Sequence, residues 1–324
     1  MNAMVRAYPL VVGVVGAGRV GSVLGAALNR AGHRVVAAAA VSAASRERAA
    51  RLLPGAAILP ADDVARAATD LLLLAVPDDA LAAVVRGLAT TGALRAGQVV
   101  AHTSGAHGLA VLGGVDGIAL HPAMTFTGER SDLDRLPGIA WGVTTRDRAF
   151  ATRLVAELGG VPEWVAEESR PLYHAALAHG ANHLVTLVNE AADLLRAAGV
   201  ADPARVLSPL LHAALDNALR LGDAALTGPV SRGDAGTVAK HLERLPAASV
   251  PAYLALARRT ADRAIASGRL RPQDAVQLLD VLARVQEALE RGAAPGRVRQ
   301  AVARARDVVP VRDVAPARVP GAPA

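Results

Sequence analysis

Residues 16–21 read Gly16-Ala17-Gly18-Arg19-Val20-Gly21 and space their glycines as G-x-G-x-x-G. The motif follows an apolar run and precedes a helix-forming stretch, and this strand–turn–helix context is typical of a dinucleotide-binding fold. Gly16 permits the tight turn, Gly18 lets the backbone approach a pyrophosphate, and Gly21 lets helix and strand pack closely. Free N–H groups at the start of the helix, at Arg19 and Val20, face the anion. We expect Gly16, Gly18, Arg19, Val20 and Gly21 to bind a dinucleotide cofactor.

The end of the second apolar run indicates which nicotinamide cofactor is bound. An NAD site normally carries Asp or Glu about 20 residues beyond the glycines, where the carboxylate binds the ribose hydroxyls. Residues 38–46 read AAAVSAASR and hold no acid. Ser42 and Arg46 can hold the 2′-phosphate of NADP(H), which no carboxylate repels there. The alternative is that Arg46 and Arg48 are solvated helix residues.

Polar side chains also follow later apolar runs, where ligands of an open α/β sheet bind. Val76 and Pro77 end one run and are expected beside the cofactor. Ser104 follows the next and can hold a carboxylate or an oxyanion. His121 follows a third and can donate a proton. The alternatives are a turn or cap role for Ser104 and a structural role for His121.

The second half of the chain supplies further candidates. His174, Ala178 and Asn182 share one face of a regular α-helix, and small neighbours would let a cofactor approach. His179 and His183 have a metal-capable spacing, but neither an HExxH motif nor a nearby acid supports zinc, so no metal is predicted. Arg232 lies in a polar loop between helices and is a natural clamp for a substrate carboxylate. The alternative for that loop is a plain turn before a helix capped by Asp234.

The elements that position these residues change character along the chain. Short apolar runs alternate with helical stretches up to about residue 166, which predicts a doubly wound, Rossmann-like α/β fold with a parallel sheet. From Pro171 onward the apolar spacing is near 3.6 and predicts helices only. We therefore expect a cofactor-binding domain over 1–168, an all-helical substrate or dimerisation domain over 169–292, and a disordered basic tail over 293–324. Apolar helices in the second domain fit a homodimer or a buried core equally.

Composition excludes several classes of function. The chain has no Cys among 324 residues, which excludes disulfides, Cys-ligated zinc, iron–sulfur clusters and a thiol nucleophile. Only 2% of residues are aromatic, which argues against base stacking, and most of the net charge of +6 lies in the tail, so nucleic acid is not an expected partner. No apolar run reaches the roughly 20 residues of a membrane span. These features favour a cytoplasmic protein that binds small molecules.

Six motifs resemble, in order, those of a bacterial family that joins a Rossmann-like NADP-binding domain to a helical C-terminal domain of formerly unknown function. They are GAGRVG, LLLLAVPDD, VAHTSGAHG, LHPAMTF, YHAALAHGANHL and LTGPVSRGD, and they span roughly residues 10–290. The family is related to 6-phosphogluconate dehydrogenase, pyrroline-5-carboxylate reductase and ketopantoate reductase. Some members look like alternative ketopantoate reductases, so the resemblance implies reduction of 2-dehydropantoate in pantothenate synthesis.

One position departs from these relatives. They place a Lys four residues before an Asn on the first helix of the second domain, and this chain matches the Asn with Asn182 but has Ala178 in place of the Lys. His121 or His174 would then protonate the substrate. We expect an NADPH-dependent reductase of a small 2-keto acid, in which Asn182 orients the carbonyl and Ser104 with Arg232 holds the carboxylate. The alternative is a non-catalytic NADP-binding sensor or assembly protein.

Overall fold

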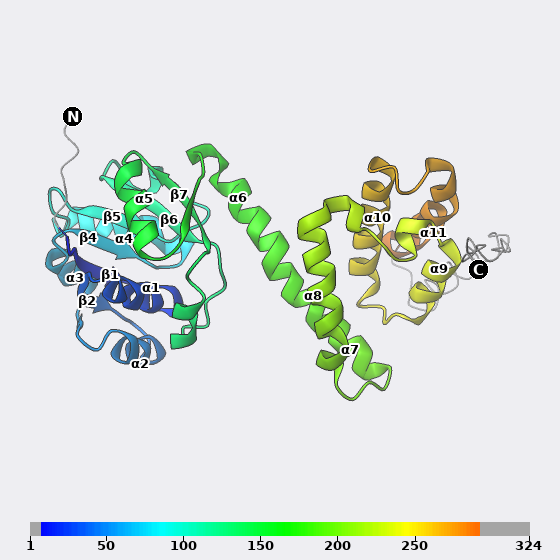
Figure 1. The fold of residues 1–324 in the computed structure, drawn as a ribbon, viewed down its shortest axis with the longest axis horizontal. Helices are drawn as coiled ribbons and strands as arrows, with labels where there is room; N and C mark the ends of the chain where they lie inside the picture. Colours follow the sequence, from blue (N-terminus) through cyan, green and yellow to red (C-terminus); the bar gives the residue numbers. More distant parts are fainter. Residues whose placement is uncertain (1–7, 292–324) are drawn as a thin grey trace, which may run out of the picture. The chain divides into compact units, whose positions relative to one another are not determined.

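The computed structural model describes residues 8–291, and the expected tail over 293–324 lies outside the described residues. The described chain forms two compact units, which divide between Val185 and Thr186 (Figure 1). The domain limits expected at 168/169 and 292/293 stay a prediction. The expected fold class is confirmed, because a mostly parallel sheet with flanking helices precedes a helical region.

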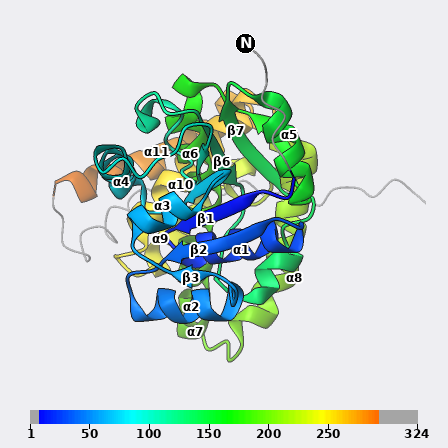
Figure 2. The same cartoon turned by 90° about the vertical axis from the view of Figure 1, so that its left-hand side faces the viewer.

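In the described residues, eight strands form one sheet in the order β3-β2-β1-β4-β5-β6-β7-β8. Figure 2 shows β1, β2 and β3 following one another across it. The strands are β1 (Val11–Val15), β2 (Arg34–Ala39), β3 (Ala57–Ile58), β4 (Leu71–Leu74), β5 (Val99–His102), β6 (Gly117–Pro122), β7 (Ala140–Thr145) and β8 (Val161–Trp164). The strand order reverses between β1's two neighbours, so the carboxyl end of β1 is the position where an open α/β sheet binds ligands.

Strands β1 to β6 are parallel, whereas β7 runs antiparallel to β6. Only a short 3₁₀ helix, Arg130–Asp134, lies between β6 and β7. A parallel return needs a crossover that is usually an α-helix, so this connection brings the chain back in the opposite direction. The antiparallel register places Gly142 directly opposite His121.

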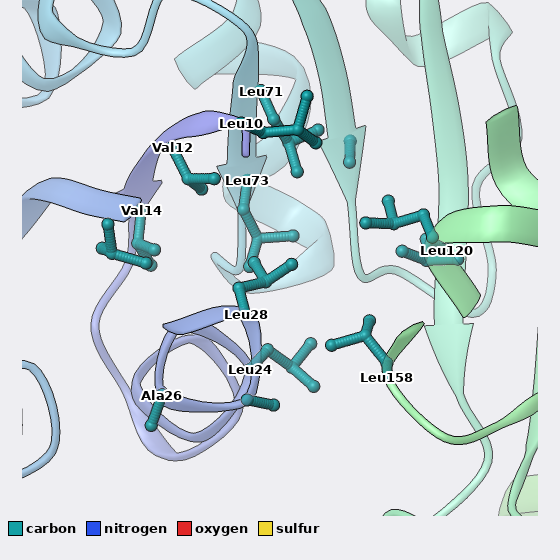
Figure 3. Packing of buried hydrophobic residues seen from close by; sticks show 14 of the residues in the cluster. Leu10, Val12, Val14, Leu24, Ala26, Leu28, Leu71, Leu73, Leu120 and Leu158 are labelled. Atoms are coloured by element: carbon teal, nitrogen blue, oxygen red, sulfur yellow. The ribbon is translucent and has the colours of Figure 1, made fainter. Parts of the chain in front are cut away.

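Helices cover both faces of the sheet. Side chains of α1 (Arg19–Arg30), α2 (Ala43–Leu52) and α5 (Arg148–Glu157) bury one face, and Figure 3 shows Leu24 and Leu28 of α1 near Val14 and Leu73. Side chains of α3 (Ala61–Ala67) and α4 (Asp78–Thr90) bury the other. Strand β4 reads Leu-Leu-Leu-Leu and is buried throughout, as expected of a strand covered on both sides.

The chain from α6 (Arg170–Leu177) to α7 (His183–Ala197) was expected to be one regular helix. The structure instead inserts a π turn over Ala178–Asn182 between them. Because π hydrogen bonds join residues five apart, this turn departs from the regular helix that the sequence predicted, and the shared face of His174, Ala178 and Asn182 stays a prediction.

The second unit is helical in its described part. It continues through α8 (Pro203–Leu221), α9 (Ala235–Arg244), α10 (Val250–Ala266) and α11 (Pro272–Glu290). The last three helices share a core that includes Leu242, Leu254 and Leu278. The described residues contain no helix with the length and apolar character that crossing a membrane requires.

Candidate cofactor cradle and active site

The turn after β1 is held between the ends of two strands. The N–H groups of Gly16 and Ala17 both donate to the carbonyl oxygen of Ala39, at 3.1 and 2.9 Å. Gly16 has a φ of +93°, and a Cβ there would run into the carbonyl of Ala75, at the end of β4. Only glycine has both the freedom to adopt this positive φ and no Cβ to collide with the carbonyl, as the sequence predicted for the first glycine of the motif. Val76 lies beside this turn, and Pro77 precedes the first residue of α4.

Gly18 and Gly21 are glycines for different reasons. A Cβ at Gly21 would collide with the carbonyl oxygen of Gly16, so that position is closed by the protein itself. A Cβ at Gly18 would meet only that same oxygen, at 4.0 Å, so nothing in the described protein requires glycine there. The open space fits a position reserved for the close approach of a ligand.

The amino end of α1 offers unsatisfied donors to such a ligand. The first helical hydrogen bond runs from the N–H of Ser22 to the carbonyl of Gly18, and no described side chain caps the helix. The N–H groups of Arg19, Val20 and Gly21 therefore precede the helix's own hydrogen bonds. Together with the helix dipole they suit a pyrophosphate.

The end of β2 contains the residues expected at the 2′-phosphate. The Ser42 hydroxyl accepts a bond from the Ser45 N–H at 3.1 Å and so caps α2. The exposed Arg46 guanidinium donates to the carbonyl of Val41 at 2.5 Å. Arg48 is half-buried, and its Nε is a buried donor without a partner among the described residues. An orphaned cationic donor near the cradle fits an anionic ligand group, and it adds Arg48 to the residues expected there.

A second cluster lies at the carboxyl end of β6. The Nδ1 atom of His121 lies 3.0 Å from the hydroxyl oxygen of Tyr173. The rings of His121 and His174 are 6.1 Å apart at their centroids, and a Cβ at Gly105 would contact both rings. The structure therefore brings together the two histidines expected as alternative proton donors, with Tyr173 in contact with His121.

His121 and Tyr173 are both uncharged near neutral pH. Burial, followed by the charges of His174 and Arg170, lowers the pKa of His121 to about 4, and Asp78 opposes this shift. Burial raises the pKa of the Tyr173 hydroxyl above its usual value. Because Tyr173 keeps its proton, it can donate to Nδ1 of His121, and the ring proton of His121 then sits on Nε2.

Arg170 was not among the residues expected in the site, and the structure places it beside this cluster. It is 0% exposed, and its guanidinium donates to the side-chain oxygen of Thr144 and to the carbonyls of Ser104, Ala119 and Gly142. One signal was available in the sequence. A cation in the first turn of a helix opposes the helix dipole, so its position there indicates a partner outside the helix.

The remaining predicted residues are placed as follows. Ser104 is buried, and its hydroxyl accepts a bond from the His107 N–H at 3.1 Å, which is the turn role considered as its alternative. Asn182 is exposed on the π turn of the first unit. Arg232 is exposed in a short 3₁₀ helix of the second unit, and Asp234 caps α9 through the N–H of Thr237. Catalytic roles for these side chains stay predictions.

His179 and His183 lie in contact, with their Nδ1 atoms 3.1 Å apart on the exposed surface. Within residues 8–291, no group of three or more potential metal ligands occurs.

Comparisons with known proteins agree with this architecture. Residues 1–122 match the model of the Rossmann-like domain, and residues 139–260 match that of a domain of unknown function, DUF2520. No curated protein matches the chain.

Solved structures show the same fold at low identity. A candidate NADP oxidoreductase of Bacteroides fragilis has a TM-score of 0.67 and 24% identity, covering 78% of this chain and 98% of that one. Protein TM1727 of Thermotoga maritima has a TM-score of 0.59 and 18% identity, with 80% and 99% covered. An imine reductase of Myxococcus stipitatus in complex with NADP⁺ has a TM-score of 0.54 and 20% identity, with 88% and 95% covered.

Proposed function

The chain joins a Rossmann-like domain to a DUF2520 domain, and from this premise we propose that it is an NADPH-dependent reductase of a small 2-keto acid. The observation that carries the proposal is that a cofactor cradle and a proton-donating cluster lie at the carboxyl ends of strands of the same sheet. An open glycine cradle follows β1, and a neutral, hydrogen-bonded His121–Tyr173 pair lies at the carboxyl end of β6, beside His174. The names of similar folds, an NADP oxidoreductase and an imine reductase with NADP⁺, support the same chemistry.

The cradle residues would hold the cofactor, which supplies hydride when bound. The N–H groups of Arg19, Val20 and Gly21 bind the pyrophosphate, and the backbone of Gly18 allows its approach. Ser42, Arg46 and Arg48 bind the 2′-phosphate, because guanidinium groups form strong charge-assisted bonds with phosphate. A preference for NADPH over NADH follows from these cations and from the missing acid at the end of β2.

The cluster of His121, Tyr173 and His174 would bind and protonate the substrate. His121 or His174 gives a proton to the oxygen that becomes an alcohol, and Tyr173 orients the ring of His121 through its hydroxyl. Asn182 orients the substrate carbonyl, and Ser104 binds its carboxylate. The resemblance in sequence makes 2-dehydropantoate, and so a step of pantothenate synthesis, the first substrate to try.

The alternative function is a non-catalytic NADP-binding sensor or assembly protein, which the replacement of the relatives' Lys by Ala178 favours. The two functions differ in a simple assay. Purified protein is mixed with NADPH and a panel of 2-keto acids that includes 2-dehydropantoate, and absorbance at the nicotinamide band is followed. Oxidation of NADPH with one acid supports the reductase. Tight NADPH binding without turnover on any acid favours the sensor.

We also propose that the protein is a cytoplasmic homodimer. Leu187 of α7 and Leu210 and Leu219 of α8 are exposed, and the second unit contains a cavity of about 390 Å³ lined mainly by apolar side chains of α7 and α10. Apolar patches of this kind often mark an interface between proteins. Light scattering that gives the monomer mass at all concentrations would contradict the dimer.

A further inference from the structure

We propose that Arg170 is a positioning residue for the reductase reaction proposed above, because it fixes the backbone around Ser104 and Gly142 and keeps an unpaired positive charge beside His121. The inference rests on that proposed function for its catalytic meaning. The effects of Arg170 on the backbone and on the charge around His121 can be tested without substrate.

The first support is the set of atoms that the guanidinium joins. Nη1 donates to the carbonyl of Ser104 at 3.3 Å, in the loop after β5. Nη2 donates to the carbonyls of Ala119 on β6 and Gly142 on β7, at 3.0 and 2.9 Å. Nε donates to the Thr144 hydroxyl at 2.8 Å. One side chain from α6 therefore ties together β6, β7 and the loop after β5.

These acceptors surround His121. Gly142 is the residue directly opposite His121 in the antiparallel pair of β6 and β7. Gly105, the neighbour of Ser104, lies against the rings of His121 and His174. Tyr173 follows Arg170 by one turn of α6, and its ring centroid is 5.8 Å from the guanidinium carbon. The guanidinium of Arg170 therefore bonds the backbone at two positions next to His121, Ser104 and Gly142.

The second support is charge. Arg170 is 0% exposed, and all the partners described for it are neutral oxygens. None of the ion pairs among residues 8–291 includes it. Glu167 acts on Arg170 only at a distance, without an ion pair between them. A buried charge without a direct ion pair is costly, and a neutral side chain could also hold these strands together. The retained charge instead favours negative charge that develops on a substrate oxygen at this place.

Nearby Glu167 does not neutralise this charge by direct contact. Its carboxylate accepts bonds from the N–H groups of Leu109 and Ala110, at 2.7 and 2.9 Å. Glu167 and Arg170 thus hold opposite ends of the same loop, and Glu167 provides a matched control. It braces the loop as Arg170 does but is not among the groups that shift the pKa of His121.

Among residues 8–291, four charged or titratable groups act on His121. Tyr173, His174 and Arg170 face it from α6, and Asp78 acts from α4. Burial is the first cause of the low pKa of His121, while His174 and Arg170 lower it further and Asp78 raises it. Removing the charge of Arg170 should therefore raise the pKa of His121.

The test uses the full chain without substrate. The titration of His121 is followed by NMR of histidine-labelled protein, with assignment by His121→Gln. We expect Arg170→Met to move the pKa of His121 up by about one unit, the lower end of the usual effect of a nearby charge. Glu167→Gln should leave it unchanged although the loop loosens. An unchanged titration in a folded Arg170→Met protein would overturn the proposal.

Arg170→Lys keeps the inference testable if Arg170→Met does not fold. Lysine keeps the charge but cannot span four acceptors. We expect a low pKa of His121, as in the wild type, together with faster amide hydrogen exchange in residues 104–110. Unchanged exchange in that loop would show that Arg170 does not position it and would also overturn the proposal.

Activity separates this inference from the proposed function. In an active enzyme, Arg170→Lys should lower kcat at least tenfold with little change in the Kd of NADPH. If the wild type reduces no keto acid, the proposed function fails, and the titration and exchange results still decide the role of Arg170.

Discussion

The 3.0 Å contact between Nδ1 of His121 and the hydroxyl of Tyr173 joins the end of β6 to the first turns of α6. Since burial raises the pKa of Tyr173 and lowers that of His121 to about 4, both groups are uncharged near neutral pH. With Tyr173 donating to Nδ1, His121 carries its own proton on Nε2. When that proton passes to a substrate oxygen, the hydroxyl proton of Tyr173 moves to Nδ1, so the His121 ring stays neutral and the Tyr173 phenolate takes up a proton from solvent.

This arrangement predicts the effect of changing His121. His121→Gln removes the titrating ring, and loss of a general acid typically lowers turnover ~10²–10⁴-fold. His174→Gln should do so instead if His174 is the donor. NADPH binding should be unchanged, because neither ring contacts the cradle. The measurement is steady-state kinetics with 2-dehydropantoate beside calorimetry with NADPH.

The control for that experiment is His179→Gln, an exposed histidine on the π turn. It should keep wild-type turnover. If the His121, His174 and double variants all turn over at the wild-type rate, neither histidine is the donor. Tyr173→Phe then becomes the variant to measure.

The glycine cradle predicts two different kinds of damage. Gly18→Val should abolish NADPH binding and leave the protein folded, because the protein leaves room there for a side chain and only the ligand would be displaced. Gly21→Val should instead lower the thermal stability, because its Cβ would collide with the carbonyl of Gly16. Calorimetry and thermal unfolding of both variants check this. Wild-type affinity in Gly18→Val would argue against the cradle as the cofactor site.

The cations near β2 predict the choice of cofactor. NADPH should bind at least about tenfold more tightly than NADH, which is ~1.4 kcal/mol and within reach of one charge-assisted contact. Arg46→Ala and Arg48→Ala should each reduce that ratio without weakening NADH binding. Arg66→Ala is the control, because Arg66 pairs with Asp63 on α3 and should not affect either affinity. Equal wild-type affinities for the two cofactors would contradict the NADPH assignment.

Periodicity and glycine spacing predicted the architecture because both act locally. Leu71–Leu74 has no polar position and must lie between two layers, and Gly16–Gly21 follows a buried strand and opens a helix. Hydrogen bonds between residues far apart in the sequence cannot be predicted in this way. The four acceptors of Arg170 come from a loop and two strands, and nothing in the residues around 170 names them.

The candidate site was predicted in part for the same reason. His121 and His174 were found from their positions after an apolar run and on a helix, and the structure brings them together. Tyr173 was considered only as a fallback donor, because its hydrogen bond to His121 joins residues 52 apart and no local pattern shows it. The π turn was missed because i, i+4 spacing assumes a regular helix, and small residues such as Gly180 tolerate either geometry.

The last prediction concerns acid stability and His102, a 0% exposed residue at the end of β5. Its Nε2 lies 2.9 Å from the carbonyl oxygen of Gly108, while its Nδ1 is buried without a partner among the described residues. Burial lowers the pKa of His102 to about 4, and the bond to Gly108 opposes that shift. The native protein therefore holds His102 neutral, whereas the unfolded chain protonates it near pH 6.5.

The sign of the effect follows from this depressed pKa. The contribution to stability is fully present above pH 6.5 and is lost as the pH falls towards 4, because only the unfolded state gains the proton. The loss is on the order of 3 kcal/mol for His102, and His121 adds in the same direction.

Both tryptophans, Trp141 and Trp164, lie in the first unit, so their fluorescence reports its unfolding. Urea unfolding at pH 7.0, 6.0, 5.0 and 4.5 should show this fall, and His102→Gln should have a shallower one. His212→Gln, which changes an exposed histidine of α8, should keep the wild-type pH dependence. A His102→Gln protein that loses stability with acid as steeply as the wild type would show that His102 is not held neutral by its burial.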